Sequence, residues 1–544
     1  MPEDLAGLLI LKEGILLMFD IIIENGRVVD GTGNPWFRAD VALNDGKIAA
    51  VGRFPGAEAA QRIDAAQGIV CPGFIDTHSH SDLNHLINPG AEPKVMQGVT
   101  MENLGLDGLS VAPIKTDDVP HWRRHLAGLA GDPDIEWTWG SFSDYLDALD
   151  SCRVATNNSS YVGLGTIRLM VMGMDDRPAT EAEIREMQRI AARCMEEGAR
   201  GISAGLIYPP SRYQTLDEMV AIAKTVQAYE GIYDVHMRTE SDQIHEAIDE
   251  VLTISRRSGI PVQITHFKVR GRRNWGRSGE LIAMLDQART QGIDVTMAQY
   301  PYTAGSTILH ATIPPWYHTQ GAQGLLTALK EQREEIKRDI RERMDWENFA
   351  GILGWDKIFV SSVVSAANRD CEGRTIPQIA EARGLADPAD AACDLLIEEE
   401  LAVGMISFGL SEEDVVTIMQ HPSVSFITDS LLGGGKPHPR TYGTYPRILG
   451  SYVREQQVLR LEEAIRKMTS LPAQNLRLRT KGVLAAGYDA DLVVFDPAAI
   501  AETATYEEPR QYPAGIGWVL VNGIPVVAEG SHTGERPGRA VRTR

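Results

Sequence analysis

Five residues with metal-binding side chains close apolar segments of this sequence. His78 and His80 follow the run Gly68–Asp76, and residues i and i+2 of a strand point to the same face, so the two imidazoles would converge. His236, His266 and Asp429 each end a further apolar run. Imidazole and carboxylate suit Zn²⁺, and a carboxylate beside metal-activated water can carry a proton to a leaving group. The set predicts a hydrolytic metal site.

The segments between and around these ligands alternate between predicted strands and predicted helices. Helix-like segments over 181–198, 216–229, 244–257 and 279–291 lie between strand-like runs at 201–203, 232–236, 262–266, 295–297, 359–360 and 424–429. This α/β alternation predicts a (β/α)₈ TIM barrel, in which functional residues lie at the C-terminal ends of the strands. A charged helix expected over 325–343 interrupts this alternation of strands and helices and indicates an insertion at about 310–355.

Short strands with turn residues bracket the barrel. Asn25-Gly26 and Asn44-Asp45-Gly46, both typical of hairpins, separate apolar runs near the start, and the same pattern returns at 490–527. Both chain ends are therefore expected to form one small β-sandwich. The predicted organisation is an N-terminal extension over 1–17, sandwich over 18–72, barrel over 73–475, and sandwich with a solvated tail from Gly534 over 476–544.

Composition narrows the classes of partner. The chain has 544 residues and a net charge of −21, which argues against nucleic acid or an anionic membrane surface as a partner. No apolar run reaches the length of a membrane span, and the N-terminus lacks the basic start of a secretory signal. Five cysteines without CxxC spacing indicate reduced thiols and a cytoplasmic protein. A small-molecule substrate is expected, and an oligomer stays open.

Several short segments match one enzyme family as a set. They are Pro72–Asp82, Gln97–Thr100, Gly205–Pro210, His236–Glu240, Tyr300–Ala304, Pro437–Arg440 and Gly487–Val493. With them the chain resembles the amidohydrolase superfamily and, within it, the N-acyl-D-amino-acid deacylases (D-aminoacylases). The resemblance implies a (β/α)₈ barrel with metal at its mouth and a β-sandwich built from both chain ends.

The resemblance also implies roles for individual residues. His78 and His80 fall on one metal site, His236 and His266 on the other, and Asp429 on the catalytic, metal-binding aspartate. The family's substrate-binding positions fall on Lys268, Tyr300, Ser306 and Arg440. Cationic side chains at such positions suit the free carboxylate of an N-acyl amino acid.

One position departs from the family pattern. The run Gly105-Leu106-Asp107-Gly108 stands where the family has Gly-Asn-Cys-Gly with a bridging cysteine. Asp107 could bridge two metals through its oxygens. A carboxylate is a harder ligand than a cysteine thiolate, so the site would accept Mn²⁺ or Fe²⁺ as well as Zn²⁺. Either one ion or two could be bound. Glu102 is the weaker bridge candidate because it lies inside the expected strand.

The first functional hypothesis is hydrolysis of the amide bond of N-acyl amino acids, with the D configuration favoured. Metal-activated hydroxide would attack the acyl carbon, and Asp429 would pass the proton to the departing nitrogen. An alternative with the same apparatus is a hydrolase of a cyclic or other amide. A third hypothesis, of another class, is a metal-free relative acting as a scaffold. That hypothesis predicts lost ligands, whereas all five are present.

Overall fold

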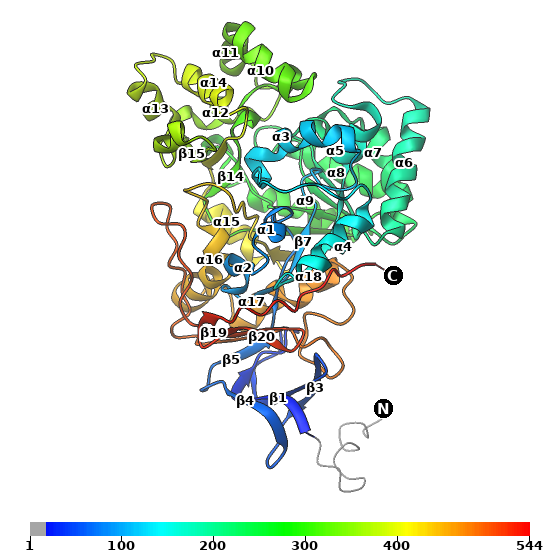
Figure 1. The fold of residues 1–544 in the computed structure, drawn as a ribbon, viewed down its shortest axis with the longest axis vertical. Coiled ribbons are helices and arrows are strands. Elements are labelled where there is room, and N and C mark those ends of the chain that lie inside the picture. Colours follow the sequence, from blue (N-terminus) through cyan, green and yellow to red (C-terminus); the bar gives the residue numbers. More distant parts are fainter. Residues whose placement is uncertain (1–17, 544) are drawn as a thin grey trace.

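The computed structural model describes residues 18–543, and the expected extension over 1–17 lies outside them (Figure 1). A β domain lies at one end of the molecule, the barrel in the middle, and a largely helical subdomain at the other end (Figure 1). No described helix is long and apolar enough to cross a membrane.

Both ends of the chain contribute strands to the β domain. Its nine strands are β1 (Met18–Val28), β2 (Phe37–Asn44), β3 (Lys47–Gly52), β4 (Glu58–Asp64), β5 (Ile69–Pro72), β18 (Leu492–Phe495), β19 (Ile516–Val521), β20 (Ile524–Ala528) and β21 (Ser531–His532). The two halves join where β18 runs antiparallel to β5, with Val493 opposite Cys71. Apolar side chains from both halves, among them Val41 and Leu492, share one buried cluster. The expected β domain built from both ends is thus confirmed.

One of the two expected hairpin turns is a bulge instead. Strand β1 continues through Asn25 and Gly26, and its register against β2 shifts between Ile23 and Gly26. A Cβ at Gly26 would lie 2.5 Å from a methyl group of Val70 in β5, so glycine here permits close strand packing. Asn-Gly marks a bulge as readily as a turn. The second turn, through Asp45, joins β2 to β3 as predicted.

The barrel consists of parallel strands in chain order. They are β6 (Phe74–Asp76), β7 (Val99–Leu104), β8 (Asn157–Ser160), β9 (Val162–Gly163), β10 (Gly201–Gly205), β11 (Ile232–His236), β12 (Val262–Ile264), β13 (Val295–Gln299) and β17 (Val424–Phe426). Only Tyr161 separates β8 from β9, so the two segments together occupy one strand position of the barrel. The backbone N–H of Asp429, after β17, donates to the carbonyl of His78, after β6, at 2.9 Å and closes the ring.

Helices follow the barrel strands as the sequence periodicity predicts. They are α1 (Asn84–Ile87), α2 (Glu92–Val95), α3 (Val119–Ala130), α4 (Phe142–Cys152), α5 (Leu164–Met172), α6 (Glu181–Glu196), α7 (Leu216–Gln227), α8 (Ile244–Ser258), α9 (Ser278–Thr290), α15 (Glu412–Gln420), α16 (Arg440–Arg447), α17 (Leu461–Met468) and α18 (Ser470–Asn475). Helix α6 is an example of how the local sequence favours a helix. Thr180 and Glu183 form a capping box at its N-terminus, and its apolar residues Met187 and Ala191 are buried.

The segment that interrupts the barrel between β13 and α15 is longer than the expected 310–355. It contains the antiparallel strands β14 (Ala304–Ile308), β15 (Ile358–Ser362) and β16 (Gly404–Phe408), with α10 (Gly321–Glu331), α11 (Arg333–Glu342), α12 (Phe349–Leu353), α13 (Ile376–Ala382) and α14 (Pro388–Glu398). The run at 359–360 was expected to be a barrel strand but lies in β15. The prediction was wrong because a short apolar run does not show which sheet its strand joins. The single helix expected over 325–343 is broken at Gln332. This segment, the insertion subdomain, has its own hydrophobic cluster.

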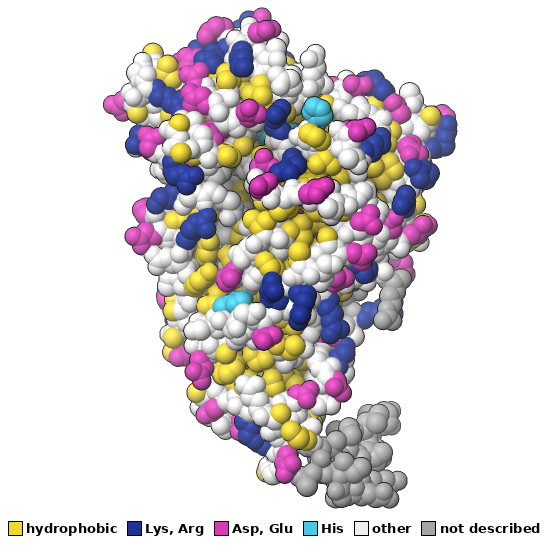
Figure 2. Space-filling model, in the orientation of Figure 1, with side chains coloured by type: hydrophobic (Ala, Val, Ile, Leu, Met, Phe, Trp, Pro, Cys, Tyr) yellow, Lys and Arg dark blue, Asp and Glu magenta, His cyan; other side chains and the backbone are white. Residues whose placement is uncertain are grey.

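The C-terminal tail is packed, contrary to the expected solvated end. Asn158 of β8 donates its N–H to the carbonyl of Arg539 at 2.9 Å and accepts from Val541 at 2.6 Å. Arg542 forms ion pairs with Asp147 and Asp150, at 2.7 and 3.1 Å. The basic tail therefore runs along the acidic side of α4. On the face in Figure 2, basic side chains are interspersed with acidic ones and form no continuous basic surface.

Candidate active site

All the sequence-predicted metal ligands lie at one end of the barrel. His78 and His80 follow β6, His236 ends β11, His266 follows β12 and Asp429 follows β17. All are buried. The carboxyl ends of parallel barrel strands point to one mouth, so side chains far apart in the sequence are brought together there.

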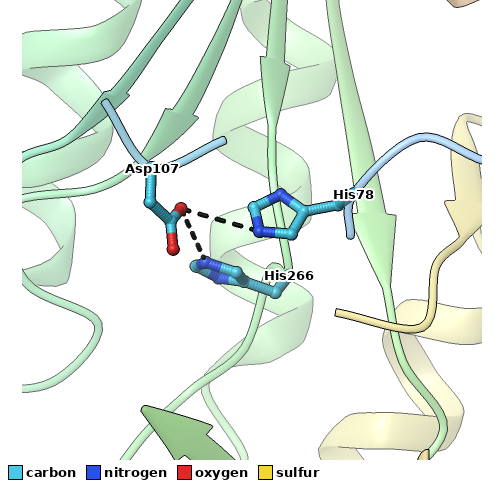
Figure 3. Close-up of side chains that lie close together, drawn as sticks. All are labelled: His78, Asp107 and His266. Atoms are coloured by element: carbon cyan, nitrogen blue, oxygen red, sulfur yellow. Dashed lines mark ion pairs between the residues drawn. The ribbon is translucent and has the colours of Figure 1, made fainter. Parts of the chain in front are cut away.

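Asp107, in the turn after β7, lies among the four imidazoles. Its Oδ1 is 3.7 Å from His78 Nε2, 3.7 Å from His236 Nδ1 and 3.6 Å from His266 Nε2. Its Oδ2 is 3.6 Å from His80 Nε2. Figure 3 shows the side chains of Asp107, His78 and His266 pointing at one another. One carboxylate therefore faces all four histidines.

Two further groups of ligand atoms flank Asp107. His78, His80 and Asp429 form one, with Asp429 Oδ1 3.6 and 3.4 Å from the two Nε2 atoms. His236, His266 and Glu240 form the other. Glu240 Oε1 lies 2.9 Å from His266 Nδ1 and 3.9 Å from His236 Nε2. Glu240 was not predicted as a ligand, although its i+4 spacing from His236 is a signal for one.

Buried donor atoms without partners indicate that this cluster fits a metal. His78 Nε2, Asp107 Oδ1 and both ring nitrogens of His236 are buried and make no hydrogen bond within the described residues 18–543. Burial is the main cause that lowers the pKa of His236 to about 4, so its imidazole is neutral at pH 7, as a ligand must be. Such unpaired polar atoms are costly unless something binds them.

The charges of the cluster favour a cation. Burial opposes ionisation of Asp107, but His78, His236 and His266 hold the pKa of that carboxyl well below its usual range. Burial and Lys268 act to lower the pKa of His266, yet Glu240 and Asp107 outweigh them and raise it to about 9. The carboxylates thus favour positive charge at this position, which a divalent cation would supply in place of the proton.

Three of the candidate residues have a left-handed backbone. Asp107, His266 and Asp429 have φ of 53°, 35° and 47°. This region costs a non-glycine residue on the order of 1–3 kcal/mol, and such strain gathers at functional sites. The surrounding barrel holds all three in place, which is consistent with a pre-organised site.

A buried lysine ties together the strand ends that carry the ligands. Lys94 Nζ lies 2.8 Å from Asp76 Oδ2, 2.8 Å from Ser79 Oγ and 2.7 Å from Thr428 Oγ1. It also forms an ion pair with Glu102 at 3.1 Å. Glu102, the weaker bridge candidate, is thus paired with Lys94 and is in none of the described ligand groups. The hydroxyl of Thr265 meets His78 Nδ1 at 2.6 Å and fixes that ring.

Three of the four predicted substrate-binding residues, Lys268, Tyr300 and Ser306, line the pocket that holds the ligand candidates, and Arg440 is buried behind Asp429 and Tyr300. Arg440 Nη1 lies 2.9 Å from Asp429 Oδ2, and Nη2 donates to the carbonyl of Ser306 at 3.1 Å. Its guanidinium lies 4.5 Å from the ring centre of Tyr300. Lys268 Nζ is held by Glu240 Oε1 at 2.5 Å. The Ser306 hydroxyl donates to the carbonyl of Met405 at 2.9 Å.

The insertion subdomain completes the pocket, and sequence reasoning missed most of this wall. The lining residues include Gly305 and Thr307 from β14, Phe349 from α12 and Ser407 from β16. The barrel adds Tyr208, Leu129 and Arg270 to the ligands and substrate candidates named above. No spacing rule links the wall residues to the histidines, since the insertion folds as a unit of its own.

Asp429 is poised as an ionised group. Burial alone would raise its pKa, but Arg440, with His80 and two other imidazoles, holds the pKa of the Asp429 carboxyl far below its usual range. It therefore presents a carboxylate to the cluster at neutral pH, able to accept a proton.

Known proteins match nearly the whole chain. The model of the "Amidohydrolase family" matches residues 61–310 and 372–527, and the unmatched stretch between them lies in the insertion subdomain. A D-aminoacylase of Alcaligenes xylosoxydans xylosoxydans is 36% identical, covering 96% of this chain and 97% of its own. An N-acyl-D-glutamate deacylase of that organism is also 36% identical, covering 96% of each chain.

Solved structures give the same result. The N-acyl-D-glutamate deacylase of Bordetella bronchiseptica, complexed with zinc and a phosphonate inhibitor, is 33% identical with a TM-score of 0.83 over 97% of this chain and 100% of its own. A D-aminoacylase structure is 34% identical with a TM-score of 0.81, over 96% and 100%. These relatives confirm the expected barrel with a β domain. The chain therefore belongs to the amidohydrolase family, together with the D-aminoacylases.

Proposed function

We propose that this protein is a metal-dependent hydrolase that cleaves the amide bond of N-acyl amino acids, with the D configuration favoured. The observation that carries the proposal is the position of Asp107 among four imidazoles, beside the Asp429 carboxylate. The relatives named as D-aminoacylase and N-acyl-D-glutamate deacylase support the substrate class.

In this proposal the ligands hold one or two divalent ions. His78 and His80 with Asp429 would hold one ion and His236 and His266 the other, with Asp107 as the carboxylate that both could share. When bound, the metal polarises the amide carbonyl and lowers the pKa of water. Zn²⁺ is the first candidate because a relative's structure contains it, and the carboxylate bridge would also suit Mn²⁺ or Fe²⁺.

The remaining roles fall to the chain's own side chains. Asp429 takes up the proton of the attacking water and returns it to the departing nitrogen. Arg440 and Tyr300 orient the substrate's α-carboxylate, as a guanidinium stacked on a ring is preset for this task. Lys268 adds positive charge while Glu240 holds it in place. Ser306 helps to position Arg440 through its carbonyl.

The test combines turnover with metal analysis. Purified protein should contain metal, and Asp429→Asn should abolish hydrolysis of every N-acetyl-D-amino acid in a D and L panel while the zinc content per chain is kept. Near-normal turnover by Asp429→Asn would disprove its role. Protein that neither contains nor takes up metal would favour the scaffold hypothesis.

We also propose that the protein works in the cytoplasm. All five cysteines lie in the described part of the chain, and none is bonded to another. Four of them are buried in reduced form. Thiols kept apart in this way are typical of reducing compartments.

A further inference from the structure

A buried carboxylate of the insertion subdomain, that of Glu347, holds a barrel loop beside the candidate metal site. Glu347 lies two positions before α12 and is 3% exposed. Its Oε2 accepts hydrogen bonds from the hydroxyl of Thr239 at 2.6 Å, from the hydroxyl of Ser241 at 2.7 Å and from the backbone N–H of Glu240 at 3.3 Å. A single oxygen atom thus holds three consecutive residues of the loop that follows β11.

Glu240, the middle one of these three residues, lies behind the imidazole of His266. Its Oε1 is 2.9 Å from His266 Nδ1, whereas His266 Nε2 faces Asp107 Oδ1 at 3.6 Å. The ring therefore presents one nitrogen to the ligand candidates and the other to a carboxylate. Lys268 Nζ lies 2.7 Å from the same Nδ1 and is also held by Glu240. A carboxylate behind a metal-binding histidine fixes the orientation of the ring and makes it a better ligand.

Arg270 joins the carboxylates of Glu240 and Glu347. Its Nη2 donates to Glu240 Oε2 at 2.8 Å, and its Nε lies 3.4 Å from Glu347 Oε1. The guanidinium also lies 4.2 Å from the ring centre of Phe349, at the start of α12. All these side chains are buried, so a shift of the insertion subdomain would leave buried charges unpaired. The position of Glu240 is therefore tied to that of the insertion subdomain.

We propose that Glu347 is a positioning residue for the candidate metal site. By holding the loop, it keeps Glu240 behind the His266 imidazole, so the affinity for metal depends on a carboxylate of the insertion subdomain. This inference rests on the proposed function, because it assigns His266 to a bound ion. Glu347 acts on the ring through Glu240 and is not itself proposed as a ligand.

The test measures the affinity for Zn²⁺ by chelator competition and needs no substrate. Glu347→Ala removes the acceptor and should lower the affinity about 10-fold, the lower end of the usual cost of losing a partner behind a ligand. Glu347→Gln keeps an oxygen that can accept from the two hydroxyls, so its affinity should stay close to that of the wild type.

Glu399→Ala is the matched control. Glu399 is another buried carboxylate of the insertion subdomain, and it holds a loop within that subdomain by accepting from the backbone N–H groups of Val364 and Ser365 at 2.7 and 2.8 Å. Its replacement should weaken the subdomain and leave the Zn²⁺ affinity unchanged.

A pair of smaller changes covers the case in which Glu347→Ala does not fold. Thr239→Val combined with Ser241→Ala removes both hydroxyl donors and keeps every buried charge. This doubly substituted protein should also bind Zn²⁺ more weakly than the wild type, and an unchanged affinity would overturn the proposal.

Three other results would overturn it as well. They are an unchanged affinity in Glu347→Ala, an equal loss in Glu399→Ala, and an equal loss in Glu347→Gln, which would make charge rather than hydrogen bonding responsible. Failure of the proposed function has a different signature. If the wild type binds Zn²⁺ but hydrolyses no N-acyl amino acid, the proposed function fails and the affinities still decide the role of Glu347. If the wild type binds no Zn²⁺, both fail together.

Discussion

Replacing Lys94 by methionine should disrupt the candidate metal site without changing any of the proposed ligands. The Lys94 ammonium joins Asp76, at the end of β6, to Thr428, two residues after the end of β17. Asp76 lies two residues before His78, and Thr428 immediately precedes Asp429. Loss of the ammonium would free both strand ends, so the geometry of these two ligands should loosen.

The expected cost follows from the burial of this ion pair. Burial alone would lower the pKa of Lys94, but Asp76 and Glu102 raise it above its ordinary value, so the group is charged at pH 7. Methionine would leave two buried carboxylates without their cation. Removing one partner of a buried ion pair costs about 3–5 kcal/mol, and we expect a loss of unfolding free energy in that range.

A matched lysine separates loss of stability from loss of the site. Lys481 is also buried and pairs with Asp491 at 2.6 Å and Asp489 at 3.1 Å, but it lies beside the β domain. Lys481→Met should therefore destabilise the protein to a similar degree and keep its metal. The assay measures the urea midpoint and the zinc content per chain for both variants. Equal metal affinity in Lys94→Met and Lys481→Met would refute the reasoning.

Two further predictions concern the bridge and the response to acid. Asp107→Ala should lower metal affinity at least about 10-fold in a chelator competition. Asp107→Cys should restore metal binding, with a preference for Zn²⁺ over Mn²⁺. An unchanged number of metal ions per chain in Asp107→Ala would argue against a bridge. Burial lowers the pKa of His125 to about 4, so between pH 6.5 and 4 the unfolded chain binds a proton that the folded chain does not, and stability falls as the pH falls. His125→Gln should remove up to about 3 kcal/mol of that fall, measured as urea unfolding at pH 6.5 and 4.5, and an unchanged fall would contradict the prediction.

The parts of the fold that the sequence predicted are those with a regular period. Helices such as α7 and α8 were predicted to within a few residues because their apolar positions repeat every three to four residues. Histidines that close apolar runs were found because a parallel barrel places every strand end at one mouth. The bulge at Gly26 and the packed tail at Arg542 were missed, since both depend on partners far away in the sequence.

The division between barrel and insertion explains why chemistry was easier to predict than selectivity. The candidate metal ligands follow barrel strands, so their order along the chain reflects their order in space. The pocket wall, by contrast, combines Arg270 of the barrel with Gly305 and Ser407 of the insertion sheet, and the last two residues meet because β14 pairs with β16. Changes within that sheet could therefore alter the substrate's side chain while Asp107 and the histidines stay fixed. A family built in this way would keep one reaction and vary its substrates through the insertion.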